Sequence, residues 1–375
     1  MTRRGWHQAA VALAVAGLVV AAREASAADS VVRVLLESGL DSIRVQLPDG
    51  AVRHLSRASD GGLLVDMGRS GLVWESPRSG IHRVGDWTIE GRIRVRSRGA
   101  DLAVIALVAL ERYVEGGVGR EMPSSWDAKA LRAQAVVSRT YALHALRHPG
   151  DDDYDVEATT TSQVFGGRAA AVATVRAAVA ATRGEYLAHE GEPILAVFHS
   201  ASGGQTAAAE EVWGDSRPYL RSIAVKEEEE APSTYWRAEV SRTTLRRVLG
   251  QLGLDVGPDA ELSVVERWPS GRVKRLELRG RGGARQLSGE LLRRALGPNV
   301  VKSTLFELRR DGREVVIVGS GHGHGVGMSQ WGAKAMAEGG ASHQEILATF
   351  FPGTTLERVG SEHSTAASLA AGGGE

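Results

Sequence analysis

The sequence predicts an α+β fold in which helices and mainly antiparallel sheets form two lobes around a cleft, after an N-terminal β-rich region. Two observations predict it. From Val31 to Val108, short apolar alternations of period two are broken by glycines and polar turns, which is typical of short strands. After Val108 the apolar period becomes helical, and strand-like and helical stretches then follow one another. With 375 residues, the chain can bury a large core without disulfides.

Both ends of the chain are expected to lie outside the fold. Residues 1–27 read as a secretory signal peptide, because a basic start precedes the apolar stretch 9–22 and small residues follow at 25–27. That stretch is shorter than the roughly 20 apolar residues of a membrane span, although an uncleaved anchor remains the alternative. We therefore expect export to the periplasm or cell envelope. Residues 358–375 are small and polar, which is typical of a disordered tail.

Composition excludes several classes of function. Lysine and arginine number 45, and so do aspartate and glutamate, so no net positive field is available to hold nucleic acid. The chain has no cysteine, which excludes disulfides, thiolate zinc sites and cysteine nucleophiles.

The main domain is predicted to span residues 109–357. A helix is expected over 107–122, and a second helix over 124–147, with Ser124 or Ser125 and Asp127 in a capping-box-like start. The acidic run 225–233 reads as a solvated linker. The remaining predictions are a helix over 169–184, a strand pair over 186–204, an inserted α+β lobe at about 234–310, and a helix over 329–340.

Glu121 is the carboxyl group that this pattern singles out. It continues the apolar stripe of its helix, and burial there would raise its pKa toward the range of a general acid. The dipole of the following helix would act in the opposite direction. Pro123 restricts Met122 to an extended geometry, so Glu121 lies at a break between two helices. The alternative is a structural ion pair with Arg120 or Arg139.

Arg139 lies close to the apolar stripe of its own helix. An arginine in that position is either the partner of a buried ion pair or a ligand for an anion or a sugar. The residues alone leave both roles open.

The stretch FHSASGGQT, residues 198–206, brings histidine, serine and paired glycines together. A serine nucleophile is disfavoured, because no G-x-S-x-G elbow is present and His199 and Ser200 would point to opposite faces of a strand. A polar loop that lines a cleft fits better. Downstream, Trp213 and Tyr219 could pack either on a ligand or in the core.

The string GSGHGHGVGMSQWGAKAMAEGG, residues 319–340, allows two interpretations. His322 and His324 would share one face of an extended segment, which suits a metal ion, with His199 or a carboxylate as a further ligand. The alternating glycines from Gly319 to Gly327 would instead clear one face, so that backbone or a flat ligand could approach closely.

Four motifs in this order resemble those of the SpoIID/LytB family. They are LERYVEGGVGREMPSSWDAKALRAQAVVSRTYAL, FHSASGGQTAAAEEVWG, PYLRSI, and GHGVGMSQWGAKAMAEGG followed by ILATFFPGTTL. The resemblance covers about Val31 to Leu356.

The resemblance implies a lytic transglycosylase that cuts the MurNAc-GlcNAc bond of peptidoglycan, preferably in strands stripped of peptides, without a cofactor. Glu121 matches the family's catalytic glutamate, which would protonate the glycosidic oxygen and then accept the proton of the sugar's 6-hydroxyl to give a 1,6-anhydro product. Glycan strands are the expected partner, together with a cell-wall amidase, and a non-catalytic amidase enhancer is the alternative. The implied substrate-binding set is Arg139, His199, Ser200, Ser202, Gly203, Gly204, His324, Gly325, Ser329 and Gln330.

Two positions depart from the family. Some members bind zinc through His and Cys where this chain has Thr161 and Ser162, so that site is missing. His322 occupies a position where the family often has an aromatic residue, which argues against a metal-binding pair. His324 is therefore expected to donate a hydrogen bond to the sugar or to Glu121.

Overall fold

The computed structural model describes residues 30–159, 163–226, 228, 230–257, 259–311 and 314–359. The predicted signal peptide and residues 360–375 of the predicted tail lie outside these ranges. The described residues form helices and mostly antiparallel sheets, so the predicted α+β class is confirmed. Among them, no helix is both long and apolar enough to cross a membrane.

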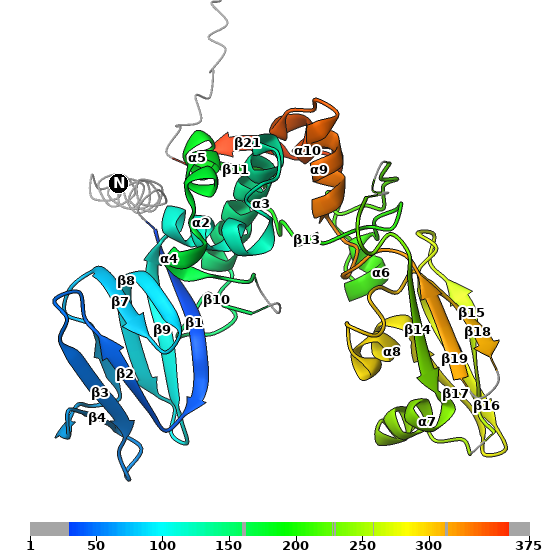
Figure 1. Cartoon of the computed structure of the whole chain (residues 1–375), viewed down its shortest axis with the longest axis horizontal. Coiled ribbons are helices and arrows are strands. Elements are labelled where there is room, and N and C mark those ends of the chain that lie inside the picture. The colour runs from blue at the N-terminus through cyan, green and yellow to red at the C-terminus, as the bar shows by residue number, and fades with distance from the viewer. Residues whose placement is uncertain are drawn as a thin grey trace, which may run out of the picture.

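A large N-terminal sheet comes first along the chain (Figure 1). Its strands are paired in the order β10-β1-β9-β8-β7-β2-β3-β4-β5, with β6 against β8. Only β10 against β1 is parallel in this sheet. The strands are β1 (Val31–Leu40), β2 (Ser42–Gln46), β3 (Val52–Arg57), β4 (Leu63–Val65), β5 (Gly68–Arg69), β6 (Val73–Glu75), β7 (Gly80–Val84), β8 (Trp87–Ser97), β9 (Leu102–Ala109) and β10 (Val156–Glu157).

A layer of helices follows directly. Strand β9 is buried along nearly its whole length and continues into α2 (Leu110–Glu121), which packs on α3 (Ala128–Arg147). Asp127 caps α3, since its carboxylate accepts the N–H of Lys129 at 2.7 Å; the cap is therefore neither Ser124 nor Ser125. The single helix predicted over 169–184 is instead two, α4 (Gly167–Ala170) and α5 (Ala173–Ala181).

The C-terminal part of the chain packs on α3. Helices α9 (Gln330–Glu338) and α10 (His343–Phe350) both contact it. Arg358, expected in the tail, belongs instead to a strand that pairs with β11. The remaining elements here are β11 (Glu185–His189), β12 (Glu192–Pro193), β13 (Phe198–His199), α6 (Ala209–Trp213), β20 (Met328–Ser329) and β21 (Thr355–Arg358).

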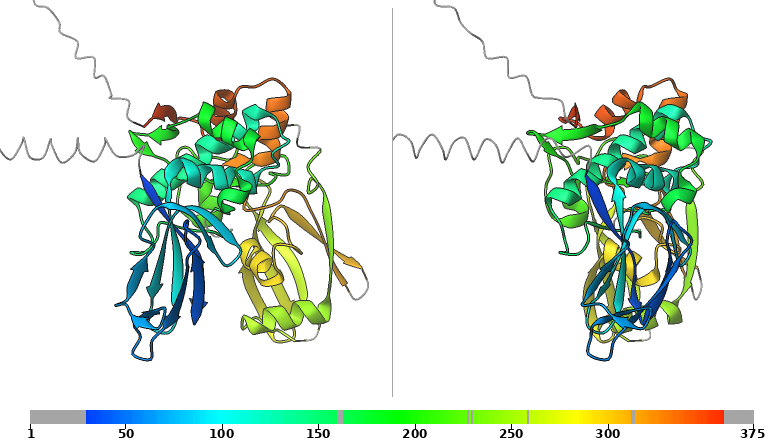
Figure 2. Two further views of the ribbon diagram at one scale, coloured as in Figure 1. Left: turned by 60° about the vertical axis from the view of Figure 1, so that its left-hand side comes forward. Right: turned by 90° about the vertical axis from the view of Figure 1, so that its left-hand side faces the viewer.

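The inserted lobe has its own apolar core, which is centred on side chains such as Leu249, Leu276 and Leu292. It extends to Gly319, because β19 pairs with β14. Figures 1 and 2 show this lobe and the N-terminal sheet projecting from the same side of the helical layer. Its elements are β14 (Trp236–Ser241), α7 (Arg242–Gln251), β15 (Glu261–Arg267), β16 (Val273–Gly280), β17 (Gly283–Ser288), α8 (Gly289–Leu296), β18 (Phe306–Asp311) and β19 (Glu314–Gly319).

Candidate functional site

Glu121 is the last residue of α2, and the chain turns to an extended conformation at Met122. Its carboxylate accepts the backbone N–H of Val164 at 2.9 Å. Burial raises the pKa of the Glu121 carboxyl, while the Val164 N–H, the Gln330 amide and the positive charge of Arg120 act in the opposite direction. The net shift is upward, so this carboxyl retains a proton more readily than an exposed glutamate does.

The start of α9 lies against Glu121. The Gln330 amide donates to the backbone carbonyl of Glu121 at 3.2 Å. The next residue, Trp331, makes an edge-to-face pair with Trp126, with ring centroids 4.9 Å apart. Both tryptophans are half-buried and so keep some exposed surface. Neither tryptophan was predicted from the sequence as a site residue, although each lies in one of the four motifs.

The Ser/Gly loop, residues 200–204, is joined to the glycine-histidine segment, residues 320–327. Strands β13 and β20 pair in parallel, with Phe198 opposite Met328. Ala201 and His322 then exchange backbone hydrogen bonds of 3.1 and 2.8 Å. The N–H of Trp331 donates to the carbonyl of Ser200 at 3.0 Å, which ties the loop to the start of α9. The structure therefore brings Glu121 and the two predicted loops into one neighbourhood.

The glycines of this segment allow close backbone packing. Gly321, Gly323, Gly325 and Gly327 all have positive φ, between 72° and 110°, so the segment is not the extended strand that we expected. A Cβ atom on Gly327 would lie 2.1 Å from the carbonyl oxygen of Val197, and one on Gly325 would lie 2.3 Å from the Arg272 guanidinium. Close backbone packing therefore explains these glycines. The groups that pack against them belong to the protein itself and not to a ligand.

The two histidines predicted to contact substrate are held by the backbone. His324 Nε2 lies 2.9 Å from the carbonyl oxygen of Phe198, and its Nδ1 accepts the N–H of Val326 at 3.1 Å. Both ring nitrogens are therefore occupied, which corrects the expectation that His324 donates to a sugar or to Glu121. His199 is buried, and its Nδ1 lies 3.1 Å from the carbonyl oxygen of Val326. Burial lowers the pKa of His324 to about 4 and holds that of His199 well below its usual range.

A metal centre finds no support within the described ranges, where no group of three or more His, Cys, Asp or Glu side chains could hold an ion. Thr161 and Ser162, at the family's zinc position, lie outside the described residues. The ring of His324 instead contacts that of Trp213, with centroids 5.5 Å apart. Trp213 is 44% exposed and is available to a ligand, whereas Tyr219 belongs to the core.

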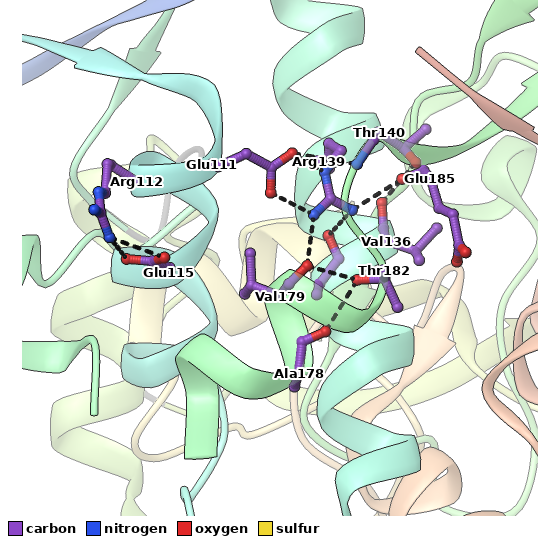
Figure 3. Close-up of polar contacts among 12 residues, drawn as sticks. Glu111, Arg112, Glu115, Val136, Arg139, Thr140, Ala178, Val179, Thr182 and Glu185 are labelled. Atoms are coloured by element: carbon purple, nitrogen blue, oxygen red, sulfur yellow. Dashed lines mark hydrogen bonds and ion pairs between the residues drawn. The ribbon is translucent and has the colours of Figure 1, made fainter. Parts of the chain in front are cut away.

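Arg139 is a structural residue rather than a sugar ligand. Its guanidinium has no exposed surface and makes a bidentate pair with Glu111, with both N–O distances 2.8 Å (Figure 3). It also donates to the carbonyl of Glu185 at 2.9 Å, and so links α2, α3 and β11. The sequence allowed an ion pair with Glu121, but the partner is Glu111. A fully buried side chain cannot contact a glycan strand, so the prediction that Arg139 binds substrate is wrong.

The other predicted substrate residues divide by exposure. Ser200 and Gly203 are half-buried and Gly204 is exposed, so these three can face a ligand. The others are buried, and each has a contact within the protein. This buried set is Ser202, Gly325, Ser329 and Gln330.

Glu228 is a buried carboxylate that the sequence analysis missed. It lies in the run predicted to be a solvated linker, yet it is only 6% exposed. Its oxygens accept hydrogen bonds from Ser202, Gly203 and Ser329. The prediction of a solvated linker is therefore wrong at this residue. Nothing in a run of glutamates indicates which member turns inward.

Comparison with known proteins shows the family of this chain. The model of the SpoIID family, described as stage II sporulation protein, matches residues 98–189, and a domain of unknown function, DUF8618, matches residues 224–327. A stage II sporulation protein D of Bacillus amyloliquefaciens is 32% identical over 68% of this chain and 76% of its own length. An uncharacterized protein of Brachyspira hyodysenteriae is 31% identical over 68% of both chains. An amidase enhancer of Bacillus subtilis is 31% identical over 65% of this chain, and that match spans 40% of the enhancer. The chain therefore belongs to the SpoIID family.

Proposed function

We propose that this protein is a peptidoglycan lytic transglycosylase in which Glu121 is the general acid and base. The observation that carries the proposal is the Glu121 carboxyl, whose pKa is raised by burial at the junction of α2, the 163–166 segment and α9. Trp331, in the first turn of α9, and its partner Trp126 add aromatic surface on which a sugar ring can pack.

The reaction needs one carboxyl group. Protonated Glu121 donates its proton to the glycosidic oxygen, and the bond from that oxygen to C1 breaks. The resulting carboxylate accepts the proton of the sugar's own 6-hydroxyl as O6 forms the new bond to C1. No water is consumed, and the carboxyl group ends in its starting state. Enzymes that use water as nucleophile, or a second carboxylate, need a pair of acids instead.

The proposed substrate is a peptidoglycan strand, preferably free of peptides, and the proposed location is the cell envelope after export. The half-buried Ser200, whose carbonyl accepts the N–H of Trp331, offers its hydroxyl near the start of α9. One relative is named an amidase enhancer, which favours a second candidate function: stimulation of a wall amidase without cleavage of glycan.

A matched pair of variants separates these functions. Glu121→Gln removes the proton donor. The control Glu115→Gln removes another carboxylate of α2, which forms an ion pair with Arg112. With peptide-free glycan strands, we expect wild type and Glu115→Gln to release soluble fragments, and Glu121→Gln to release none. Full activity of Glu121→Gln would refute the mechanism. An inactive wild type that still accelerates an amidase would favour the enhancer.

A further inference from the structure

The carboxylate of Glu228 is held by a set of hydrogen bonds. Oε2 accepts the N–H of Ser202 at 3.0 Å, its hydroxyl at 2.5 Å and the N–H of Gly203 at 3.0 Å. Oε1 accepts a second contact from the Ser202 N–H at 3.1 Å and the hydroxyl of Ser329. These hydrogen bonds satisfy the buried charge, and the positive charge of Arg272 also interacts with it. Charge-assisted hydrogen bonds are about twice as strong as neutral ones.

These donors come from two separate parts of the chain. Ser202 and Gly203 belong to the Ser/Gly loop, more than a hundred residues before Ser329. Ser329 is the N-cap of α9, and its hydroxyl oxygen accepts the N–H of Gly332 at 3.2 Å while its proton goes to Glu228. One carboxylate therefore holds both the loop and the first turn of the helix.

That first turn carries a side chain that contacts Glu121. Gln330 follows Ser329 and donates to the Glu121 carbonyl, and Trp331 pairs with Trp126. There is little free space at this turn, since a Cβ on Gly332 would lie 2.8 Å from a Val225 methyl group and 3.2 Å from Glu228 Oε1. A displacement of the carboxylate would therefore move Gln330 and Trp331.

We propose that Glu228 is a positioning residue of the reaction, which fixes the Ser/Gly loop and the start of α9 against the Glu121 carboxyl. This inference rests on the proposed function. It gives Glu228 a role that Glu230, in the same acidic run, does not share. Glu230 is 78% exposed at its side chain and pairs with Lys334 on the surface.

The test compares Glu228→Gln with the control Glu230→Gln. Glutamine keeps the shape but turns an NH₂ group toward donors, so the loop and the helix turn are expected to separate. A misplacement of about 1 Å can cost about 100-fold in rate, so we expect kcat on peptide-free glycan strands to fall by about that factor in Glu228→Gln and to stay unchanged in Glu230→Gln. Because the Gln330 amide lowers the pKa of Glu121, its displacement should also move the limb of the kcat profile governed by Glu121 to higher pH. A purely structural loss would lower the amount of active enzyme without moving that limb.

Hydrogen exchange followed by mass spectrometry tests the clamp without any need for turnover. The amides of residues 202–204 and 330–332 should exchange faster in Glu228→Gln, and those of the inserted lobe should not. If Glu228→Gln does not fold, Ser329→Ala removes the link to α9 together with the N-cap bond to the Gly332 N–H. The diagnostic amide is then that of Trp331, which donates to the Ser200 carbonyl and should exchange faster. Unchanged exchange, or an unchanged kcat profile, would overturn the inference. If wild type cleaves no glycan, the proposed function fails, and the catalytic part of the inference fails with it. Faster exchange would still establish the clamp.

Discussion

Replacement of Arg139 by methionine should destabilise the main core and leave the inserted lobe intact. The guanidinium is fully buried, makes two 2.8 Å contacts with Glu111 and donates to the Glu185 carbonyl. Glu111 is itself only 14% exposed at its side chain, so methionine would strand a largely buried carboxylate. Breaking one side of a buried pair costs about 3–5 kcal/mol.

Urea unfolding followed by circular dichroism provides the assay. The inserted lobe has a separate apolar core, so its transition serves as an internal reference. With an m-value of about 3 kcal/mol per molar urea, the main transition should move to lower urea by roughly 1 M or more. The double variant Glu111→Leu/Arg139→Met should recover part of the loss, because it leaves no uncompensated charge. A loss of activity with an unmoved main transition would refute this reasoning and restore Arg139 as a substrate ligand.

Three further predictions concern the backbone and pH. Gly327→Ala should destabilise the protein by more than Gly353→Ala. Both glycines have positive φ, but only at Gly327 would the new Cβ lie 2.1 Å from the Val197 carbonyl oxygen. Equal losses of melting temperature in the two variants would contradict this. Burial lowers the pKa of His324 to about 4, below the ordinary value of 6.5. The contribution of the neutral ring to stability is therefore present above pH 6.5 and is lost as pH falls toward 4. The free energy of unfolding should change less steeply with pH in His324→Gln over that window than in wild type. The pKa of Glu121 is raised, so its contribution is present below 4.5 and is lost as pH rises; Glu121→Gln should therefore raise the melting temperature at pH 7 more than at pH 4.

Local pattern predicted the regular elements well. The helical period anticipated α3, and the apolar alternation from Val31 to Val108 anticipated the strands of the N-terminal sheet. The break between α4 and α5 could not be predicted from an alanine-rich stretch that favours one continuous helix. The end of α4 packs closely on α2, since a Cβ atom added to Gly119 would lie 1.9 Å from the carbonyl oxygen of Ala170, and this is a tertiary contact.

The sequence identified many of the residues of the candidate site but not the role that each of them has. Glu121 was identified from its place on an apolar stripe, and the structure adds the direction of its net pKa shift, which is upward. The glycine-histidine segment was expected to be extended because glycine every second residue resembles a strand, but alternating left-handed residues give the same spacing. Glu228 could not be identified, since its burial depends on N–H groups that converge only in the folded chain.

The most direct test of the central claim is the mass of the fragments that wild type releases from peptide-free glycan strands. The account predicts 1,6-anhydro ends, each lighter by one water than the reducing end left by hydrolysis, and their absence with Glu121→Gln. Reducing ends from wild type, or anhydro ends at an undiminished rate from Glu121→Gln, would contradict it.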